Sequence, residues 1–450
     1  MLAAMPPTRP STPKRVEAPI RDRGDACPGA LRLHQADDGR LARLRLPGGL
    51  LTSHQVRALA LAADSLGDGH LSITSRGNVE LRGLGDDCGS ALAELLRDAG
   101  LLPSETHERV RNVVASPLAG LDGLGRADVQ LWVRELDALL CAAPWSAALS
   151  GRFLFALDDG RGDVAGLGAD VTLIAEPDAG SARVRVGVRE VCRVPADDAP
   201  RAALAAARAF LAAARAAGTG AWRVRELPPG RSVDVAAHLA EAGLAFSPVD
   251  AAAAAPARAG DGPAPGGTAA PGPRPLPGVV TPPGTPAPGP VAPPAAVSVV
   301  APLGRVTSAQ MRALLPADEV RVTPWRGLVV TGFADRRAAT ERLAALDAAG
   351  LITSPDSPWL GTGACTGRPG CAKSLSDVRA DATPGTGGLP VHWSGCERRC
   401  GHPQGAWVDV VATGDGVYEV TVRDGAAARP VPMTRAGLAA TVAAARTTTR

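Results

Sequence analysis

The chain has 450 residues, of which 45% are hydrophobic, and its formal net charge is +3. This length allows two to four domains with cores of their own. The nearly balanced charge argues against nucleic acid as a partner, and no apolar run approaches the length of a membrane span. We therefore expect a soluble protein that binds neither nucleic acid nor a membrane.

The first segment, residues 1–24, has no apolar stretch of the kind found in a signal peptide. We expect it to be disordered, and we expect the protein to be cytoplasmic with reduced thiols. Lysine occurs only at Lys14 and Lys373, so nearly all the positive charge is arginine. Any anion-binding site in the chain must therefore be built from arginines.

Two segments of the chain, 48–84 and 303–332, share one ordered pattern. Each opens a helix with Thr-Ser-x-Gln-x-Arg, beginning at Thr52 and at Thr307. The threonine is a suitable N-cap residue, and the apolar spacing after it is helical. Because several features recur in the same order, the pattern indicates an internal duplication.

Both copies then continue to a strand that ends in an Arg-Gly step, which makes Arg326 the predicted equivalent of Arg76. A second strand and a second helix follow in each copy. This order of elements predicts two ferredoxin-like β-α-β-β-α half-domains, residues 25–110 and 299–358.

Each half-domain precedes an α/β domain, residues 111–250 and 359–450. The first contains a helix at 201–217 and strand-like stretches at 151–160, 169–176 and 182–188. Residues 251–298 are mostly Ala, Pro and Gly, cannot bury enough apolar surface to offset chain entropy, and are expected to be a disordered linker. The predicted fold class is α/β (α+β), with two similar halves related by a pseudo-two-fold axis.

Four cysteines in the last domain stand in the spacing C-x5-C, 24 residues, C-x3-C: Cys365, Cys371, Cys396 and Cys400. The spacing favours a [4Fe–4S] cluster, which needs four thiolates and accepts loose spacing. Zinc usually binds tighter knuckles, and a disulfide framework is not expected in a long chain without a signal peptide. The other cysteines, Cys27, Cys88, Cys141 and Cys192, are scattered and are expected to be small hydrophobic residues outside this site.

The duplicated half-domain and the cysteine spacing resemble the nitrite/sulfite reductase superfamily over nearly the whole chain outside the linker. Within it, ACPGALR (26–32), VRVTPWRGLVV (320–330) and SGCERRCGHP (394–403) resemble the precorrin-3B synthases of aerobic cobalamin biosynthesis. The resemblance implies two α/β domains of the nitrite/sulfite reductase type, a monomer, and an iron–sulfur enzyme acting on a tetrapyrrole.

A carboxylate-rich macrocycle calls for several arginines, because guanidinium binds carboxylate through two parallel hydrogen bonds. The resemblance places the candidate tetrapyrrole-binding residues at Arg76, Asn78, Arg111, Asn112, Arg152 and Arg326. Lys373, His392 and His402 are weaker candidates near the cysteines, and Asp158-Asp159-Gly160 is predicted to form a turn. One departure concerns the strand Arg152-Phe153-Leu154, where siroheme reductases typically carry two basic residues around the phenylalanine.

The implied reaction is the O₂- and NADH-dependent hydroxylation of precorrin-3A at C20, with formation of a γ-lactone. It implies a [4Fe–4S] cluster and leaves open an additional mononuclear iron or siroheme. No Gly-x-Gly-x-x-Gly follows a strand, so electrons from NADH are expected through a partner protein. Two alternatives remain: a ferredoxin-dependent sulfite or nitrite reductase with siroheme, and a non-catalytic Fe–S or zinc module.

Overall fold

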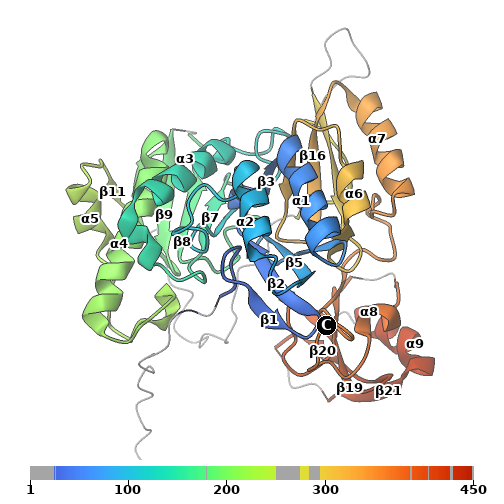
Figure 1. Cartoon of the computed structure of the whole chain (residues 1–450). Coiled ribbons are helices and arrows are strands. Elements are labelled where there is room, and N and C mark those ends of the chain that lie inside the picture. The colour runs from blue at the N-terminus through green and yellow to red at the C-terminus, as the bar shows by residue number, and fades with distance from the viewer. Residues whose placement is uncertain are drawn as a thin grey trace, which may run out of the picture.

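The computed structural model describes residues 25–447 except 26, 179, 250–273, 283–293, 386–387, 404 and 426–428. Its described residues form four sheets with helices packed on them (Figure 1). The first α/β domain lies at one side of the molecule, the half-domains lie in the middle and opposite, and the cysteine-containing domain lies below them (Figure 1). The predicted α/β (α+β) fold class is confirmed.

The two half-domains contain the same elements in the same order. The first has β1 (His34–Ala36), β2 (Gly39–Leu44), β3 (Leu50–Thr52), α1 (Ser53–Leu66), β4 (His70–Ile73), β5 (Val79–Leu84) and α2 (Gly89–Asp98). The second has β12 (Gly278–Val280), β13 (Ala295–Val300), β14 (Arg305–Thr307), α6 (Ser308–Ala313), β15 (Glu319–Val322), β16 (Gly327–Phe333) and α7 (Arg336–Ala348).

The half-domains exchange a strand with each other. Strand β3 of the first half pairs with β15 of the second, and β14 of the second pairs with β4 of the first. The registers are equivalent, because Leu51 lies opposite Val320 while Val306 lies opposite Leu71. One hydrophobic core runs through both halves. The half-domains therefore form a single folding unit, and neither is expected to be stable alone.

The Thr-Ser-x-Gln pattern forms a capping box in both copies, as its sequence predicts. The Thr52 hydroxyl accepts a hydrogen bond from Gln55 N at 3.2 Å, and the Gln55 side chain accepts one from Thr52 N at 3.0 Å. Thr307 and Gln310 repeat this arrangement at 3.0 and 2.9 Å. Each glutamine also donates to the carbonyl that ends the second helix of its half, at Ala99 and Ala349.

The two α/β domains share one strand order. The first contains β6 (Val113–Ala115), α3 (Val129–Ala142), β7 (Phe155–Asp158), β8 (Val171–Ala175), β9 (Ser181–Val186), β10 (Arg189–Pro195), α4 (Ala199–Ala217), α5 (Val235–Glu241) and β11 (Ser247–Pro248). The second contains β17 (Thr362–Ala364), α8 (Val378–Asp381), β18 (Val391–Ser394), β19 (Trp407–Gly414), β20 (Val417–Arg423), β21 (Val431–Thr434) and α9 (Arg435–Arg446).

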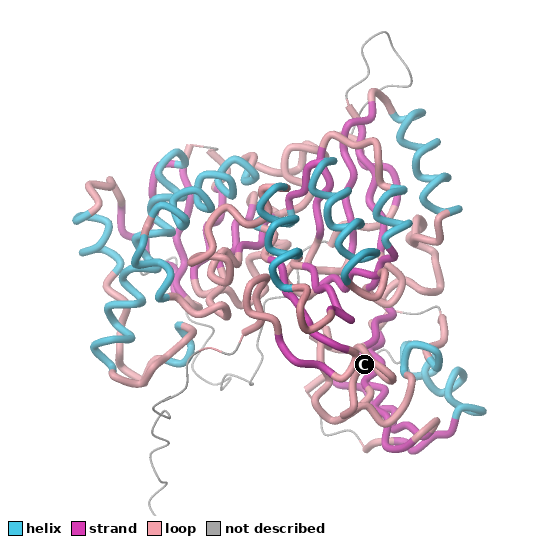
Figure 2. Tube along the Cα trace, viewed as in Figure 1, coloured by secondary structure: helices cyan, strands magenta, loops and turns pink. Residues whose placement is uncertain are grey.

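Each sheet begins with three parallel strands, β6-β7-β8 or β17-β18-β19, and continues with antiparallel ones. Helices α3 and α4 pack on the first sheet, and α9 packs on β19, β20 and β21 of the second. Figure 2 shows the strands of the first domain behind these helices. The duplication thus extends from the half-domains to the α/β domains.

The prediction of one continuous linker at 251–298 is wrong over part of its length. Strand β12 pairs with β13, Gly278 opposite Ser298 and Val280 opposite Ala296, and Val279 packs against the core of the half-domains. Three consecutive residues of Gly-Val-Val favour a strand once an unpaired sheet edge is available. Residues 251–273 and 283–293 of the predicted linker, and residues 1–24, lie outside the described residues.

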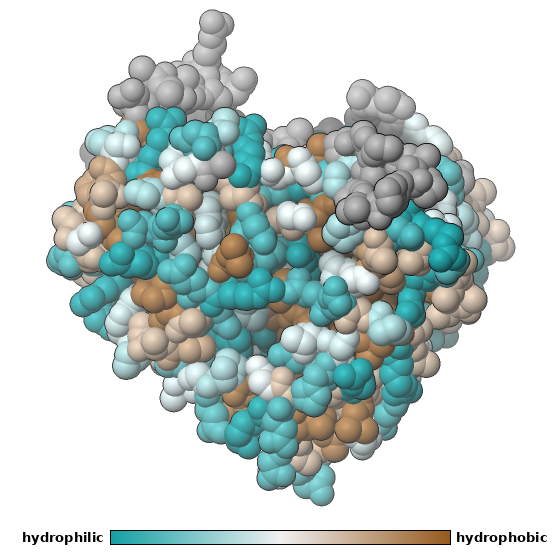
Figure 3. All heavy atoms as spheres, turned by 90° about the horizontal axis from the view of Figure 1, so that it is seen from above, coloured by the Kyte–Doolittle hydropathy of each residue, from teal (hydrophilic) through white to brown (hydrophobic). Residues whose placement is uncertain are grey.

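No helix among the described residues is long and apolar enough to cross a membrane. On the face seen in Figure 3, apolar side chains are interspersed with polar ones.

Candidate active site: a cavity beside four cysteines

A cavity of about 520 Å³ lies where the half-domains meet both α/β domains. Its walls come from the turn after β4, the loop after β7, residues 223–225, Arg274 and the region of β13–β15. The cysteine-containing domain contributes the beginnings of β17 and β18 and residues 401–403 and 405, after Cys400. The apolar lining includes Leu154, Leu167, Val300, Ala301, Pro324 and Trp325. The charged lining residues are Arg76, Asp163, Arg223, Arg225, Arg274 and Arg326. Five guanidinium groups and one carboxyl line the cavity, and Arg223 is the one of the five that pairs with a described aspartate behind the lining, Asp170. The excess of positive charge and the apolar lining suit a polyanion that also has apolar surface.

The two cysteine loops leave the same edge of one sheet. Cys365 follows β17 and Cys396 lies two residues after β18, and these strands are parallel neighbours. Burial, and then the nearby charges of Cys365, Cys396 and Cys371, raise the pKa of the Cys400 thiol. The four thiols therefore lie near one another. The fold therefore brings both halves of the cysteine pattern to one place.

The loops fit an iron–sulfur cubane better than zinc. Zinc in a tetrahedral site holds its sulfur atoms about 3.8 Å apart, given Zn–S bonds of about 2.3 Å. Among the described residues, only three aspartates place three potential ligand atoms within 4.8 Å of one another, so no three of the cysteine sulfurs do. The Gly395 amide donates a hydrogen bond of 3.2 Å to Cys365 Sγ, an interaction that tunes sulfur ligands of clusters.

Close packing of the loop requires glycine at position 395. A Cβ there would collide with the Ser374 side chain, which lies within the loop after Cys371. His392 is buried beside this loop and its Nε2 hydrogen-bonds to the Cys400 carbonyl at 2.9 Å, while its Nδ1 has no hydrogen-bond partner. Burial and the neighbouring Arg326 lower the pKa of His392 to about 3, so the imidazole is neutral. The other flanking candidates differ: His402 lines the cavity and stacks on Trp407 at 5.2 Å between ring centroids, and Lys373 is exposed.

Arg76 reaches the cavity as predicted from the strand-end position, and its guanidinium has no hydrogen bond or ion pair to any described residue. Burial, and then the nearby charges of Arg223 and Arg45, lower its pKa to about 10. Burying a guanidinium without a carboxylate partner costs free energy of folding, and a bound anion offsets that cost. Arg76 is therefore the best-placed anion ligand of the cavity.

The predicted equivalence of Arg76 and Arg326 is wrong by one residue. In the first turn Thr74 N donates to Asn78 O and Gly77 N donates to Thr74 O; in the second, Thr323 N donates to Gly327 O and Arg326 N to Thr323 O. Arg326 thus matches Gly77, and both have φ near +60°. Arg76 matches Trp325. Matching the two Arg-Gly steps shifts the alignment by one residue, because in the second turn Arg326, and not a glycine, occupies the left-handed backbone region.

Arg326 lines the cavity and connects it to the cysteine domain. Its Nη2 donates a hydrogen bond of 2.6 Å to the Gly401 carbonyl, one residue after Cys400. Glycines at 304, 363 and 401 leave room for the side chain, since a Cβ at any of them would collide with it. This residue is therefore a link between the second half-domain and the cluster loops, with one edge toward the cavity.

Four other predicted tetrapyrrole-binding residues are not in the cavity lining. The Arg111 guanidinium pairs with both oxygens of Asp137 at 2.6 Å. Asn78 donates to Asn112 at 2.9 Å, and both side chains are buried and bonded further to backbone groups. Arg152 lies 5.1 Å from the Trp222 ring centroid. Internal partners thus satisfy polar groups of Arg111, Asn78 and Asn112, and Arg152 lies outside the lining. A role of these four residues in tetrapyrrole binding therefore stays a prediction.

The sequence reasoning missed Arg223, Arg225, Arg274 and Trp325. Arg223 pairs with Asp170 at 2.5 Å, and no described residue pairs with Arg225. Their Trp-Arg-Val-Arg context offers no motif, but the near absence of lysine was a signal that arginines would line any anion site. Trp325 lies within VRVTPWRGLVV (320–330), a stretch that indicated the family resemblance but no binding role for the tryptophan.

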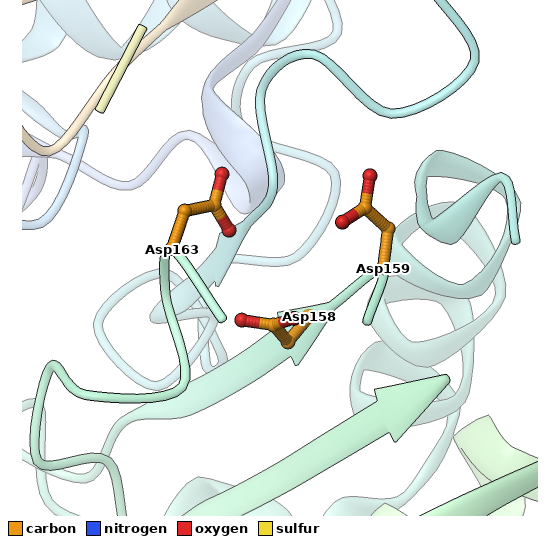
Figure 4. Close-up of side chains that lie close together, drawn as sticks. All are labelled: Asp158, Asp159 and Asp163. Carbon is orange, nitrogen blue, oxygen red and sulfur yellow. The ribbon is translucent and has the colours of Figure 1, made fainter. Parts of the chain in front are cut away.

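Three buried aspartates at and after the end of β7 point toward one another (Figure 4). Asp158, the last residue of β7, accepts four backbone hydrogen bonds from residues 160–165, so the turn predicted at Asp158-Asp159-Gly160 lies mainly after Asp159. Asp159 pairs with Arg161 at 2.6 Å, and Asp163 accepts from the Ser116 hydroxyl at 2.6 Å. Burial, and then Asp158 and Asp159, raise the pKa of Asp163 to about 7 against the Ser116 hydrogen bond. Since backbone amides satisfy Asp158 and the Arg161 guanidinium pairs with Asp159, we interpret the group as a structural network rather than a metal site.

The remaining cysteines belong to other elements. Cys192 is buried in the core of the first α/β domain, Cys141 lies in α3, and Cys88 precedes α2. Cys27 lies near Arg45 and Arg76, in the segment before β1. None of them is in the loops after β17 and β18.

Comparison with known proteins agrees with this architecture. The model of the nitrite/sulfite reductase ferredoxin-like half domain matches residues 33–99. A precorrin-3B synthase from a Sinorhizobium species is 28% identical over 420 residues, which cover 91% of this chain and 84% of that protein. A ferredoxin–nitrite reductase from Synechococcus elongatus is 28% identical over 414 residues, covering 81% of this chain and 74% of the reductase. The predicted resemblance to this family is confirmed.

A solved structure has a similar fold. The structure of the NirA protein of Mycobacterium tuberculosis superposes with a TM-score of 0.63 at 20% identity, covering 89% of this chain and 78% of NirA. Leu154 follows Phe153, at the position where the sequence comparison expects the second of two basic residues in siroheme reductases. Leu154 lines the cavity and packs in a small apolar cluster with Trp325. That part of the cavity is thus apolar.

Proposed function

We propose that the chain is an oxidoreductase of the precorrin-3B synthase type, with a [4Fe–4S] cluster on Cys365, Cys371, Cys396 and Cys400. One observation carries the proposal: the cysteine loops and the arginine-lined cavity share a wall, because Gly363, Gly401 and His402 line the cavity beside Cys365 and Cys400. A macrocycle in the cavity would then lie next to the cluster. The four thiols, the glycine-rich loops and the Gly395 amide suit that cluster.

The cavity has the two surfaces that a carboxylate-rich tetrapyrrole needs. Leu154 and Trp325 offer an apolar face for the ring, and Arg76 offers an unpaired guanidinium for a peripheral carboxylate. A well-shielded bidentate pair contributes about 1.5–3 kcal/mol to binding. The chain's part in the reaction is to orient the ring against this face, exclude water from it and fix its carboxylates.

The proposed reaction is the hydroxylation of precorrin-3A at C20 with γ-lactone formation. One atom of O₂ enters the product, the other leaves as water, and NADH supplies two electrons, through a partner protein since no dinucleotide-binding motif is visible. When bound, the cluster supplies one-electron transfer. A mononuclear iron or siroheme belongs to the proposal only as a group to be tested, because no described residue set is assigned to it.

Two alternatives stay open. A ferredoxin-dependent nitrite or sulfite reductase is favoured by the Synechococcus relative and the NirA fold. Leu154 weighs against it, since an apolar wall gives a small oxyanion one positive partner fewer. A non-catalytic Fe–S or zinc module is the second alternative; the cavity weighs against it.

The experiment is an anaerobic purification followed by assay with precorrin-3A, O₂ and an NADH-linked reductase. The proposal expects one O₂ consumed per hydroxylated product and an absorption spectrum without a siroheme band. A siroheme band with nitrite or sulfite reduction would establish the first alternative. Protein that contains zinc, and no iron or labile sulfide, would establish the second.

A further inference from the structure

The segment 274–282 lies between two stretches of the Pro/Ala/Gly-rich region that the structure does not describe. Its strand β12 is the edge of the second half-domain's sheet, antiparallel to β13. Because Gly278 lies opposite Ser298, the residues before Gly278 run toward the end of β13, and there Val300 and Ala301 line the cavity. The strand pairing therefore directs residues 274–277 to the cavity.

Arg274 is the charged residue that this segment brings there. It lines the cavity together with Arg76 and Arg225, and no described residue accepts a hydrogen bond from its guanidinium. Its guanidinium is exposed at the cavity rim and is therefore open to an anion that enters the cavity.

Contacts made by neighbouring residues hold Arg274 in place, so its charge is not needed to attach the segment. Val279 attaches the segment to the half-domain core, and the β12 backbone is paired with β13. Arg274 itself is exposed, at the cavity rim, and adds nothing to that attachment. The charge is therefore free to serve a ligand.

We propose that Arg274 is a carboxylate-binding residue of the cavity, so that part of the Pro/Ala/Gly-rich region belongs to the ligand-binding site. This inference rests on the proposed function. Arg76 and Arg274 come from different half-domains and would bind different carboxylates of one ligand. The ligand class is consequently a molecule with carboxylates on more than one edge.

The test uses the full-length protein and uroporphyrin, a macrocycle with eight carboxylates, as the probe. Binding is measured by quenching of porphyrin fluorescence for wild type, Arg274→Gln, Arg274→Lys and Arg76→Gln. Arg337→Gln is the matched control, because Arg337 is an exposed arginine of α7 paired with Glu341. We expect Arg274→Gln to weaken binding about 5- to 20-fold, Arg274→Lys to weaken it less, and Arg337→Gln to leave it unchanged.

A second measurement needs no variant. Phenylglyoxal modifies accessible arginines, and mass spectrometry reads the modification at Arg274 with and without uroporphyrin. Protection of Arg274 by the porphyrin, with Arg337 labelled equally in both samples, supports the proposal. In the opposite outcome, Arg76→Gln weakens binding, Arg274→Gln binds within twofold of wild type, and Arg274 is not protected. The porphyrin then binds in the cavity without Arg274, and the proposed role of Arg274 is wrong. If wild type does not bind the porphyrin, the proposed function itself fails.

Discussion

Ser116 and Cys365 occupy the same position in the two α/β domains. Each directly follows the first strand of its sheet, and each side chain accepts a hydrogen bond from the backbone amide just after the second strand: Asp159 N to Ser116 Oγ at 3.1 Å, and Gly395 N to Cys365 Sγ at 3.2 Å. The duplicated fold thus has two equivalent loop sites. One carries thiols, and the other is filled by Arg161 and its aspartates.

This relationship explains why only the second site is expected to hold a cluster. Arg161 pairs with Asp122 and Asp159, and Asp163 bonds to Ser116, so polar side chains fill the loops with their own partners. A site without thiols has no soft ligand for an iron–sulfur cluster.

The first prediction concerns the cluster ligands. Replacing Cys365 or Cys400 by Ser should abolish the iron and labile sulfide of the purified protein, because a cubane needs all four thiolates. Cys88→Ser, outside the loops, should keep both. Iron and sulfide analysis of anaerobic preparations measures this, and a cluster that survives in Cys400→Ser would remove that residue from the ligand set.

The second prediction concerns Arg76. Its replacement by Gln should weaken uroporphyrin binding about 10-fold or more, since one bidentate contact contributes about 1.5–3 kcal/mol. The cluster absorption should be unchanged. Arg152→Gln is the internal comparison: Arg152 lies against Trp222 outside the cavity lining, so its affinity should stay within about twofold. Equal losses in both variants would mean that the cavity is wrongly placed.

The third prediction separates the two parts of the Pro/Ala/Gly-rich region. A Gly/Ser segment of equal length in place of residues 251–273 should leave solubility and porphyrin affinity unchanged, because that composition cannot form a core. The same replacement of 274–282 should weaken porphyrin binding and lower the unfolding midpoint, as it removes β12 and Val279 from the sheet. Equal behaviour of the two variants contradicts this division.

The fourth prediction concerns pH. The folded pKa of Asp163, about 7, lies above the ordinary value of 3.8, so the folded state binds this proton more tightly than the unfolded state. The stabilising effect is complete below pH 3.8 and is lost as the pH rises toward 7. Between pH 5 and 8 the loss should be roughly 2–3 kcal/mol.

Asp163→Asn removes that titration while keeping an acceptor for Ser116. Urea unfolding of both proteins at pH 5 and pH 8 measures the difference, and Asp356→Asn, at an exposed loop position, is the control. An identical pH dependence in wild type and Asp163→Asn would show that Asp163 is already ionised in the folded protein.

The sequence was sufficient for the half-domains and for the cysteine pattern, because both rest on local chemistry. Thr52 and Thr307 each begin a four-residue pattern that predicts a capping box. The spacing of the four cysteines predicts their use as metal ligands without knowledge of the fold. Strand β12 was missed because three apolar residues in a Pro-rich context form a strand only when the β13 edge is present.

Arg111 and the two asparagines lie outside the cavity lining for a different reason. Their partners, Asp137 for Arg111 and buried backbone groups for Asn78 and Asn112, are distant in sequence and were visible only after folding. The equivalence of Arg326 with Arg76 failed because the backbone turn, and not the residue type, determines the alignment.

The most direct test of the account is the electron paramagnetic resonance spectrum of dithionite-reduced protein with and without uroporphyrin. The reduced protein should show the signal of a [4Fe–4S] cluster, and its shape should change when the porphyrin binds, because Gly363, Gly401 and His402 line the cavity and are close in sequence to Cys365 and Cys400. Arg76→Gln should need a higher porphyrin concentration for the same change. A protein without the cluster signal, or a signal that saturating porphyrin leaves unaltered, would contradict the central claim that one macrocycle site adjoins one cluster.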